Sequence, residues 1–198
     1  MAGLQRQAVR KKLLMNGLDQ TLFLWLNLPQ TAPHWAVKLA VFGGTSLLPL
    51  LVAATLAAAL VGRQPWRAQA WRGLLAIVLA SAATWLLKHG LNMPRPGALG
   101  LGVQWLQHSR IQGMPSSHAA VAAAWVGVAL MLPGAKPWLR VLFLAVALYV
   151  GWCRVALGLH FPFQVLAGWV LGVVCAGVAQ LGTAAWVRRS DQRLSGHE

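Results

Sequence analysis

The stretch WAVKLAVFGGTSLLPLLVAATLAAALV, residues 35–61, decides the fold class of this chain. Its one charged residue is Lys38, and its second half consists largely of alanine and leucine. A helix needs about 20 mainly apolar residues to cross a bilayer, so this stretch is long enough to cross at a tilt. Gly43 and Gly44 would allow another helix to pack closely against it. The sequence therefore predicts a membrane-spanning helix here.

Four more apolar runs follow, and we expect each to cross the membrane: residues 73–91, 116–132, 138–157 and 162–187. Before the first span, residues 13–28 carry polar side chains at helical spacing, which indicates an amphipathic helix lying in the membrane interface. We therefore expect an all-α, polytopic membrane helical bundle of about five transmembrane helices plus an N-terminal interfacial helix.

A single membrane-embedded domain should cover residues 1–198, because neither an internal repeat nor a second domain is evident. It would consist of a basic N-terminus with the interfacial helix (1–34), the transmembrane bundle (35–187) and a tail (188–198). Residues 92–115 are rich in glycine and proline and too polar to cross, so we expect a loop there. We expect no cleaved signal peptide, because polar residues interrupt the first apolar run.

Charge is scarce and unbalanced in this sequence. Only 10% of the residues are charged, against about a quarter in a soluble domain. Seventeen Lys and Arg face three Asp and Glu, which gives a net charge of +14. The cations lie in loops and tails between apolar runs, where anionic lipid headgroups attract them. We therefore expect the bilayer, and no nucleic acid, as the partner of this chain, and the oligomeric state stays open.

The three acids are too far apart in the sequence to suggest a cluster: Asp19, Asp191 and Glu198. Without clustered carboxylates the sequence predicts no Mg²⁺ or two-metal site and no paired-carboxylate hydrolase. Cys153 and Cys175 stand alone in or beside apolar runs and are expected to be small core residues. We therefore expect chemistry that uses His, Lys, Arg and hydroxyl groups, with no metal and no cofactor.

Polar residues interrupt the apolar pattern at three places: residues 88–96, 113–118 and 154–160. Polar side chains are costly in a membrane and are commonly kept for function. Counting spans places all three stretches at one membrane face, whereas one extra span would separate them by about 30 Å. The other face has more Lys and Arg in its loops, so the positive-inside rule puts the shared face outside.

The three stretches together carry the groups of a phosphoryl-transfer site. Lysine binds phosphate oxygens as a point charge and arginine as a planar fork. Ser116 and Ser117 stand where a helix begins, and the free N–H groups of a helix start favour an anion. Histidine can act as a nucleophile or as an acid and base near neutral pH. These groups predict a metal-free site in which cations stabilise the transferring phosphoryl group.

Three motifs, Lys88-x6-Arg95-Pro96, Pro115-Ser116-Ser117-His118 and Arg154-x5-His160, resemble the signature of the type 2 phosphatidic acid phosphatase superfamily in order and internal spacing. The resemblance covers roughly residues 80–180. It implies that His160 is the nucleophile that forms a phosphohistidine and that His118 is the general acid for the leaving oxygen. It also implies that the phosphoryl oxygens are held by Lys88, Arg95, Arg154, Ser116 and backbone N–H groups near Ser117.

The sequence departs from that family pattern at three positions. Ser117 stands where the second motif usually has glycine, and Cys153 stands where the third usually has serine, which removes a hydroxyl donor. Gln164 stands four residues after His160, where the family has aspartate. A glutamine oxygen can orient the imidazole by accepting its N–H, but it cannot stabilise an imidazolium by charge. Whether the acid Asp19 reaches His160 stays open.

The resemblance implies an integral membrane hydrolase of a phosphate or diphosphate on a lipid carrier, with undecaprenyl diphosphate as the first candidate. It also implies a bacterial inner membrane location, with the site facing the periplasm or cell exterior. Two alternatives stay open: a phosphotransferase that passes the phosphoryl group to a second lipid such as lipid A, and a lipid-phosphate-binding protein with catalysis weakened by Gln164. The remaining histidines are expected to be interfacial: His34, His89, His108 and His197.

Overall fold

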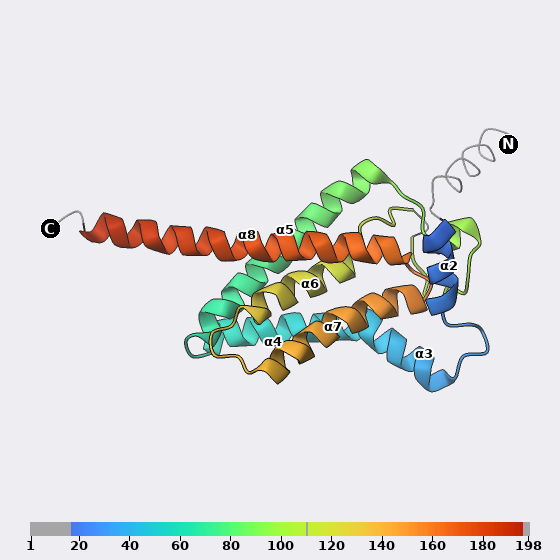
Figure 1. The fold of residues 1–198 in the computed structure, drawn as a ribbon, viewed down its shortest axis with the longest axis horizontal. Helices are drawn as coiled ribbons and strands as arrows, with labels where there is room; N and C mark the ends of the chain where they lie inside the picture. Colours follow the sequence, from blue (N-terminus) through green and yellow to red (C-terminus); the bar gives the residue numbers. More distant parts are fainter. Residues whose placement is uncertain (1–16, 110, 196–198) are drawn as a thin grey trace.

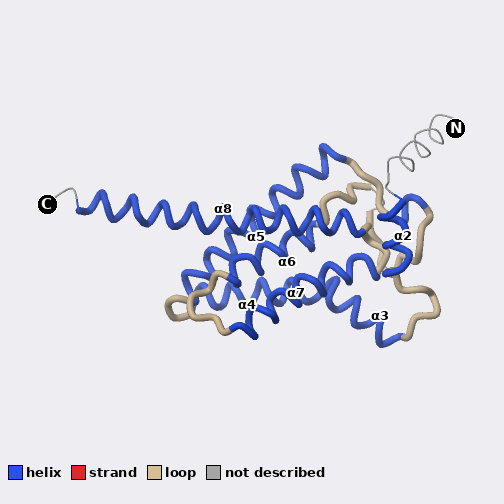
Figure 2. The backbone as a smooth tube through the Cα atoms, in the orientation of Figure 1, coloured by secondary structure: helices blue, strands red, loops and turns tan. Residues whose placement is uncertain are grey.

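The computed structural model describes residues 17–109 and 111–195, without the side chains of 185–195. The described part is helical and contains no strand (Figures 1 and 2). The predicted basic N-terminus, up to residue 16, lies outside it. In chain order the helices are α2 (Gly17–Leu26), α3 (His34–Val41), the π-helix η1 (Phe42–Ser46), α4 (Leu47–Val61), α5 (Trp66–Leu91), the 3₁₀ helix η2 (Pro96–Leu99), α6 (Ser117–Leu130), α7 (Pro137–Ala156) and α8 (Pro162–Ser195).

Four helical stretches are long and apolar enough to cross a membrane: His34–Val61, Trp66–Leu99, Pro137–Ala156 and Pro162–Ala184. Each corresponds to one of the predicted spans, and together they confirm the all-α membrane bundle. The remaining predicted span is α6, which has 14 residues. At 1.5 Å per residue α6 is about 21 Å long, shorter than a hydrocarbon core of about 30 Å. Four described helices therefore have spanning length, where the sequence predicted about five.

The second span begins earlier than predicted, at Trp66 rather than at residue 73. Arg67 and Arg72 mark the end of the apolar pattern, but they do not interrupt the helix. Long cationic side chains can extend from a helix toward the membrane surface while their stems stay on apolar surface. Charge therefore marks where α5 leaves the hydrocarbon and does not mark where the helix starts.

A π-turn precedes α4 at the glycine pair of the first span. Pro49 has no N–H to donate to the carbonyl of Thr45, and the turn just before it widens into η1. In η1, a Cβ on Gly43 would lie 2.5 Å from Cys153 Sγ, and one on Gly44 would lie 2.7 Å from Leu157. The predicted close packing at the two glycines is confirmed, and the partner is α7.

α6 lies in the middle of the bundle, where it contacts α4, α5, α7 and α8 (Figure 1). Because other helices surround α6, it buries side chains on several faces. Most of these side chains are small: Ala119, Ala120, Ala122, Ala123, Ala124, Val126 and Val128. Small side chains allow helix backbones to approach closely, which is the main source of helix association in a membrane.

The closest approach is between α6 and α8. On the α8 side of this seam lie Gly168 and Gly172. A Cβ on Gly168 would lie 2.6 Å from the carbonyl oxygen of Ser116, and one on Gly172 would overlap the carbonyl oxygen of Ala120. The two glycines therefore leave room for the backbone of α6, and the start of α6 lies against the start of α8.

The N-terminal helix α2 packs against the end of the bundle as well as facing outward. Trp25 is 87% exposed, which suits the predicted interfacial location. Phe23, however, is fully buried, and its ring meets that of Phe161 edge to face at 5.2 Å between centroids. The Asn27 side chain donates to the carbonyl oxygen of Ala156 and accepts the N–H of Val103. α2 therefore joins α7, the 92–116 loop and the start of α8.

The α6–α8 seam can be tested with Gly172→Ala. The added Cβ meets a backbone oxygen that cannot rotate away, so we expect a loss of about 1–3 kcal/mol in stability, measured as a lower Tm in detergent. Gly177→Ala is the matched control, because nothing lies within 4 Å of a Cβ there. This control should be neutral or stabilising by about 0.5–1 kcal/mol, since a helical glycine is replaced. Equal effects of the two changes would contradict the seam.

Candidate active site

The turn between α7 and α8 holds His160 beside Arg154. The N–H groups of Leu159 and His160 both donate to the carbonyl oxygen of Arg154, at 3.0 and 3.1 Å. Gly158 has a φ of +74°, a conformation open to glycine, and a Cβ there would strike the carbonyl oxygen of Val103. This one glycine allows the chain to reverse within the third motif.

The imidazole of His160 is held at both nitrogens. Its Nε2 lies 3.0 Å from Nη1 of Arg95, and its Nδ1 lies 3.1 Å from Oε1 of Gln164. A guanidinium can only donate, so Nε2 must be the acceptor. Nδ1 then carries the hydrogen and donates a hydrogen bond to Oε1 of Gln164. This assignment makes the ring neutral, with the lone pair on Nε2.

Electrostatics favour the same neutral ring. His160 is 1% exposed. Burial holds its pKa well below the ordinary value of 6.5, and the nearby charges of Arg95, Arg154 and Lys88 lower it further. The bond to Gln164 acts in the opposite direction as a smaller effect. His160 is therefore an unprotonated nitrogen base surrounded by cations.

Gln164 uses both ends of its amide. Its Oε1 accepts the N–H of Phe161 at 3.3 Å as well as the His160 N–H, and its Nε2 donates to the carbonyl oxygen of Pro94 at 2.8 Å. A carboxylate could accept the first two bonds but could not donate the third. The pocket around position 164 therefore suits an amide, and the first motif is tied to the third through Pro94.

Arg95 is almost fully buried, and its guanidinium is spread over the backbone of two loops. It donates to the carbonyl oxygens of Leu159 at 3.1 Å, Ile111 at 3.2 Å and Gln112 at 3.3 Å, in addition to His160 Nε2. Because Arg95 has these carbonyl partners, it stays in place without a carboxylate. It also occupies Nε2 of His160, the ring nitrogen that carries the lone pair.

Three buried polar side-chain atoms have no hydrogen-bond partner within the described residues: Ser116 Oγ, Arg154 Nε and Trp169 Nε1. The first two belong to the motifs. Arg154 is anchored at its other end, where Nη1 donates to the carbonyl oxygen of Gly44 at 2.9 Å. Ser116 precedes α6 with extended backbone, and its side chain makes no capping bond. An unpaired buried donor costs about 1–3 kcal/mol, which a bound anion would recover.

Lys88 and His118 complete the group that the sequence predicted. Lys88, on the last turns of α5, is close enough to Arg95 and Arg154 for their charges to repel. His118 opens α6 and is half-buried, and its ring makes no hydrogen bond within the described part of the chain. It lies within electrostatic range of the same three cations. The structure thus brings all three motifs to one end of the bundle.

Ser117 and Cys153 are the other two departures from the family pattern. Ser117 is the first residue of α6, where it needs no positive φ. Cys153 is fully buried in an apolar cluster with Ala40 and Leu157, beside Tyr149. Its side chain contributes to the packing between α7 and the glycine pair of the first span.

His108 is a residue that the sequence interpretation missed. It was expected to be interfacial, but it lies within electrostatic range of Lys88, Arg95 and Arg154. Partial burial and these charges lower the pKa of His108 to about 4, so the ring is neutral at neutral pH. No motif contains it, because it reaches the site from the irregular 92–116 loop. Only the tertiary structure could reveal it.

Asp19 does not supply the missing carboxylate to His160. Its Oδ1 accepts the N–H of Phe163 at 2.9 Å, in the first turn of α8 and one residue before Gln164. Burial raises its pKa, and the bond from Phe163 acts in the opposite direction as the smaller effect. Asp19 therefore caps α8 from another helix, at the turn that carries the orienting amide.

Comparisons with known proteins show the family of this chain. The sequence profile of the PAP2 superfamily matches residues 69–188, more than half of the chain. The chain is 26% identical over 181 residues to YbjG of Escherichia coli (strain K12), provisionally named an undecaprenyl-diphosphatase. That match covers 91% of this chain and 90% of YbjG. It is 36% identical over 81 residues to an undecaprenyl-diphosphatase of Sulfolobus acidocaldarius, covering 40% of this chain and 38% of that protein.

A solved structure shares the fold. It is the crystal structure of the first transmembrane PAP2 type phosphatidylglycerolphosphate phosphatase from Bacillus subtilis, with a TM-score of 0.65 and 20% identity. The similarity covers 93% of this chain and 96% of that one.

The cap on α8 gives a stability prediction. Asp19→Ala removes the acceptor for the Phe163 N–H, and losing a helix cap costs about 0.5–2 kcal/mol. We expect a lower Tm in detergent, with a smaller loss for Asp19→Asn because an amide oxygen still accepts. Thr21→Ala is the control on the same helix, since Thr21 is exposed and bonds only within α2. A Tm unchanged in Asp19→Ala would show that Asp19 does not hold α8.

Proposed function

Because the chain belongs to the PAP2 superfamily, we propose that it is an integral membrane phosphatase that hydrolyses a phosphate or diphosphate on a lipid carrier. One observation carries the proposal: a buried, neutral His160 lies among Lys88, Arg95 and Arg154, beside donors that have no partner. Such a group of charges calls for a multiply charged anion. A lipid phosphate brings that anion to headgroup level while its tails stay in the bilayer.

In the first step, Nε2 of His160 attacks phosphorus and the bond from phosphorus to the leaving oxygen breaks. Arg95 must first give up its bond to Nε2, and the phosphoryl oxygens are the competing acceptors that draw it away. Lys88, Arg154, the Ser116 hydroxyl and the N–H groups at the start of α6 share the developing charge. The proposed chemistry needs no metal ion, because these fixed cations take its place.

Burial and the nearby cations lower the pKa of His118 to about 3, so in this proposal the bound phosphate anion must first raise that pKa and bring a proton onto the ring. His118 then donates this proton to the leaving oxygen and accepts one from the water that attacks the phosphohistidine. The phosphorus–nitrogen bond breaks, free phosphate leaves, and His160 returns to its neutral form. Throughout, Gln164 holds the Nδ1–H so that Nε2 points at phosphorus. An amide orients the ring without stabilising its positive charge, so turnover should be slower than with a carboxylate.

Undecaprenyl diphosphate is our first substrate, because relatives that match the chain carry that name. We also propose that the chain lies in a bacterial inner membrane with the site facing the periplasm. Both points rest on support outside the geometry of the site, namely the relatives' names and the distribution of loop cations.

A second candidate function is lipid-phosphate binding with little turnover, and the amide at Gln164 favours it. Purified protein and labelled lipid diphosphate, with and without an acceptor lipid, separate the possibilities. Free phosphate without acceptor supports hydrolysis, whereas release that depends on acceptor indicates a phosphotransferase. Tight binding with no turnover under either condition indicates a binding protein.

The nucleophile is tested with His160→Ala. We expect phosphate release from undecaprenyl diphosphate to fall to background, together with loss of the acid-labile phosphoryl label on the protein. His34→Ala is the matched control, because His34 is exposed at the start of α3 and should leave the rate unchanged. Wild-type release by His160→Ala would rule out the phosphohistidine route.

The orienting group is tested at Gln164. Gln164→Leu leaves the ring without its acceptor, and a misplaced nucleophile costs on the order of 10²-fold in kcat. Gln164→Asp supplies the charge that an imidazolium needs, so kcat per folded molecule should rise. Circular dichroism and Tm correct for lost folding, since neither variant can donate to Pro94. If both variants keep the wild-type kcat, Gln164 has no role in catalysis.

A further inference from the structure

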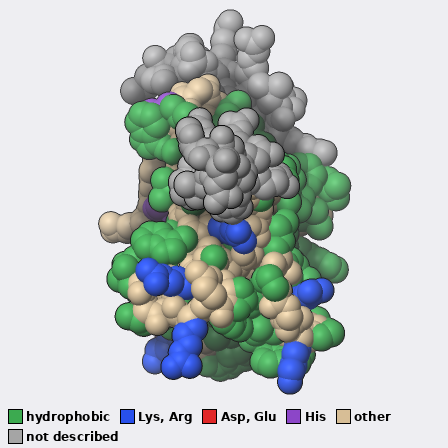
Figure 3. Space-filling view, turned by 90° about the vertical axis from the view of Figure 1, so that its left-hand side faces the viewer, with side chains coloured by type: hydrophobic (Ala, Val, Ile, Leu, Met, Phe, Trp, Pro, Cys, Tyr) green, Lys and Arg blue, Asp and Glu red, His purple; other side chains and the backbone are tan. Residues whose placement is uncertain are grey.

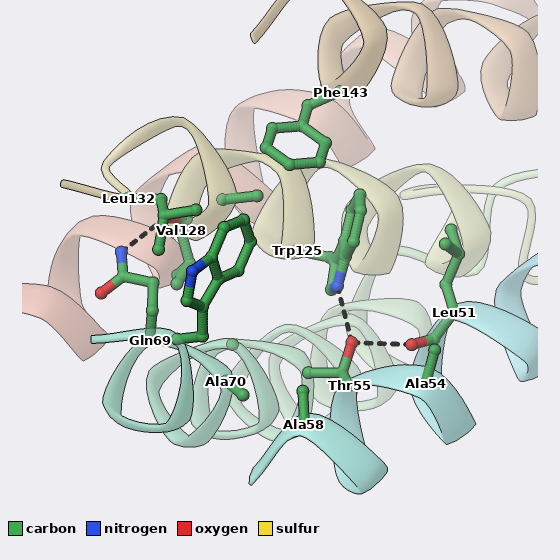
Figure 4. Close-up of a pocket in the computed structure, with 13 residues that line it drawn as sticks. Leu51, Ala54, Thr55, Ala58, Gln69, Ala70, Trp125, Val128, Leu132 and Phe143 are labelled. Atoms are coloured by element: carbon green, nitrogen blue, oxygen red, sulfur yellow. Dashed lines mark hydrogen bonds between the residues drawn. The ribbon is translucent and has the colours of Figure 1, made fainter. Parts of the chain in front are cut away.

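A cavity lies between α4, α5, α6 and α7, away from His118 and His160 (Figure 4). Its volume is about 200 Å³. Its walls come from the middle turns of α4, the first turns of α5, the second half of α6 and the first half of α7, including Leu51, Ala58, Ala70, Trp125, Val128 and Phe143. These parts of the four helices lie toward the ends opposite to those that carry the three motifs.

The length of α5 separates the cavity from the candidate active site. Trp66 lines the cavity, and Lys88 lies 22 positions later on the same unbroken helix. At 1.5 Å per residue this is about 33 Å, comparable with the thickness of a hydrocarbon core. On α6 the lining residue nearest the site is Trp125, seven positions or about 10 Å after His118. The cavity therefore extends from the face opposite the histidines toward the middle of the bundle, and it shares no lining residue with the phosphoryl site.

Three polar side chains in the cavity wall, Thr55, Gln69 and Trp125, already have hydrogen-bond partners (Figure 4). Nε1 of Trp125 donates to the Thr55 hydroxyl at 2.8 Å, and that hydroxyl donates to the carbonyl oxygen of Leu51 at 2.6 Å. The Gln69 amide donates to the carbonyl oxygen of Val128 at 2.7 Å. A water here would find few free partners, whereas an apolar cavity of about 150 Å³ can hold a benzene ring. The cavity suits a stretch of hydrocarbon.

The rim of the cavity carries positive charge. Arg72 donates to Gln69 Oε1 at 3.0 Å, so the cation contacts a lining residue directly. Figure 3 shows lysine and arginine side chains spread around hydrophobic ones at this end. The cations in these turns are Arg63, Arg67, Arg72, Lys136 and Arg140. Among the acids, only Asp19 has a described side chain, and it lies at the other end, against α8.

We propose that this cavity binds one hydrocarbon chain of an anionic phospholipid from the leaflet opposite the histidines, with the lipid phosphate against the arginine rim. The apolar wall selects the chain, and the basic rim selects a negative headgroup over a zwitterionic one. The bound lipid fills the space between four helices and so stabilises the bundle. This site is independent of the phosphatase chemistry proposed above.

The test measures Tm in detergent while phosphatidylglycerol is titrated into the full-length protein. We expect a saturable rise in Tm for the wild type and a smaller rise with phosphatidylcholine. Ala58→Phe fills the cavity and should abolish the rise. Ala57→Phe is the matched control, since it places the same ring on the exposed side of α4, and it should keep the rise. Arg63→Gln with Arg67→Gln should remove the preference for phosphatidylglycerol.

Three results would overturn the proposal. One is an equal loss in Ala57→Phe, and another is a rise that phosphatidylcholine matches in full. The third is a rise in Tm that Ala58→Phe abolishes for undecaprenyl phosphate but not for phosphatidylglycerol. That result would show that the cavity binds the tail of a carrier lipid. If Ala58→Phe does not fold, tryptophan quenching by phosphatidylglycerol with brominated chains decides. The quenched fraction should fall in Trp125→Phe, and an unchanged fraction would contradict the proposal.

Discussion

The contact between the backbones of α6 and α8 is the constraint on which the candidate site depends. Gly168 and Gly172 place no side chain on the α8 side of the seam, and the N–H of Ser116 donates to the carbonyl oxygen of Gln164 at 2.9 Å. That one bond ties the second motif to the third. A larger residue in the seam would move the serine and histidine at the start of α6 away from His160.

The charged side chains that this packing brings together are all positive. Lys88, Arg95 and Arg154 lie close enough to repel, and the described side chains offer them no carboxylate. Backbone carbonyl oxygens hold Arg95 and Arg154 instead, which fixes their positions without neutralising them. In a partly buried setting such repulsion is screened weakly. An anion with several oxygens would relieve this repulsion, which supports the proposed phosphate substrate.

The amide at Gln164 is matched to its surroundings rather than being a simple loss of charge. It accepts from His160 and Phe161 and donates to Pro94, so all three motifs are linked through one side chain and its backbone. The amide nitrogen of Gln164 donates to the carbonyl oxygen of Pro94, and a carboxylate at this position could not make that bond. Orientation of the ring is kept, and stabilisation of its positive charge is reduced.

The sequence alone determined the helical membrane fold, the common face of the three motifs and the resemblance to a phosphatase superfamily. These follow from apolar run length and from residue spacing within single segments, which are local properties. It did not determine the shortness of α6, the partner of Asp19 or the approach of His108 to the cations. Nor could it show that Gln164 reaches Pro94, 70 positions away. Such contacts depend on how whole helices and irregular loops pack against one another, and no local pattern encodes that packing.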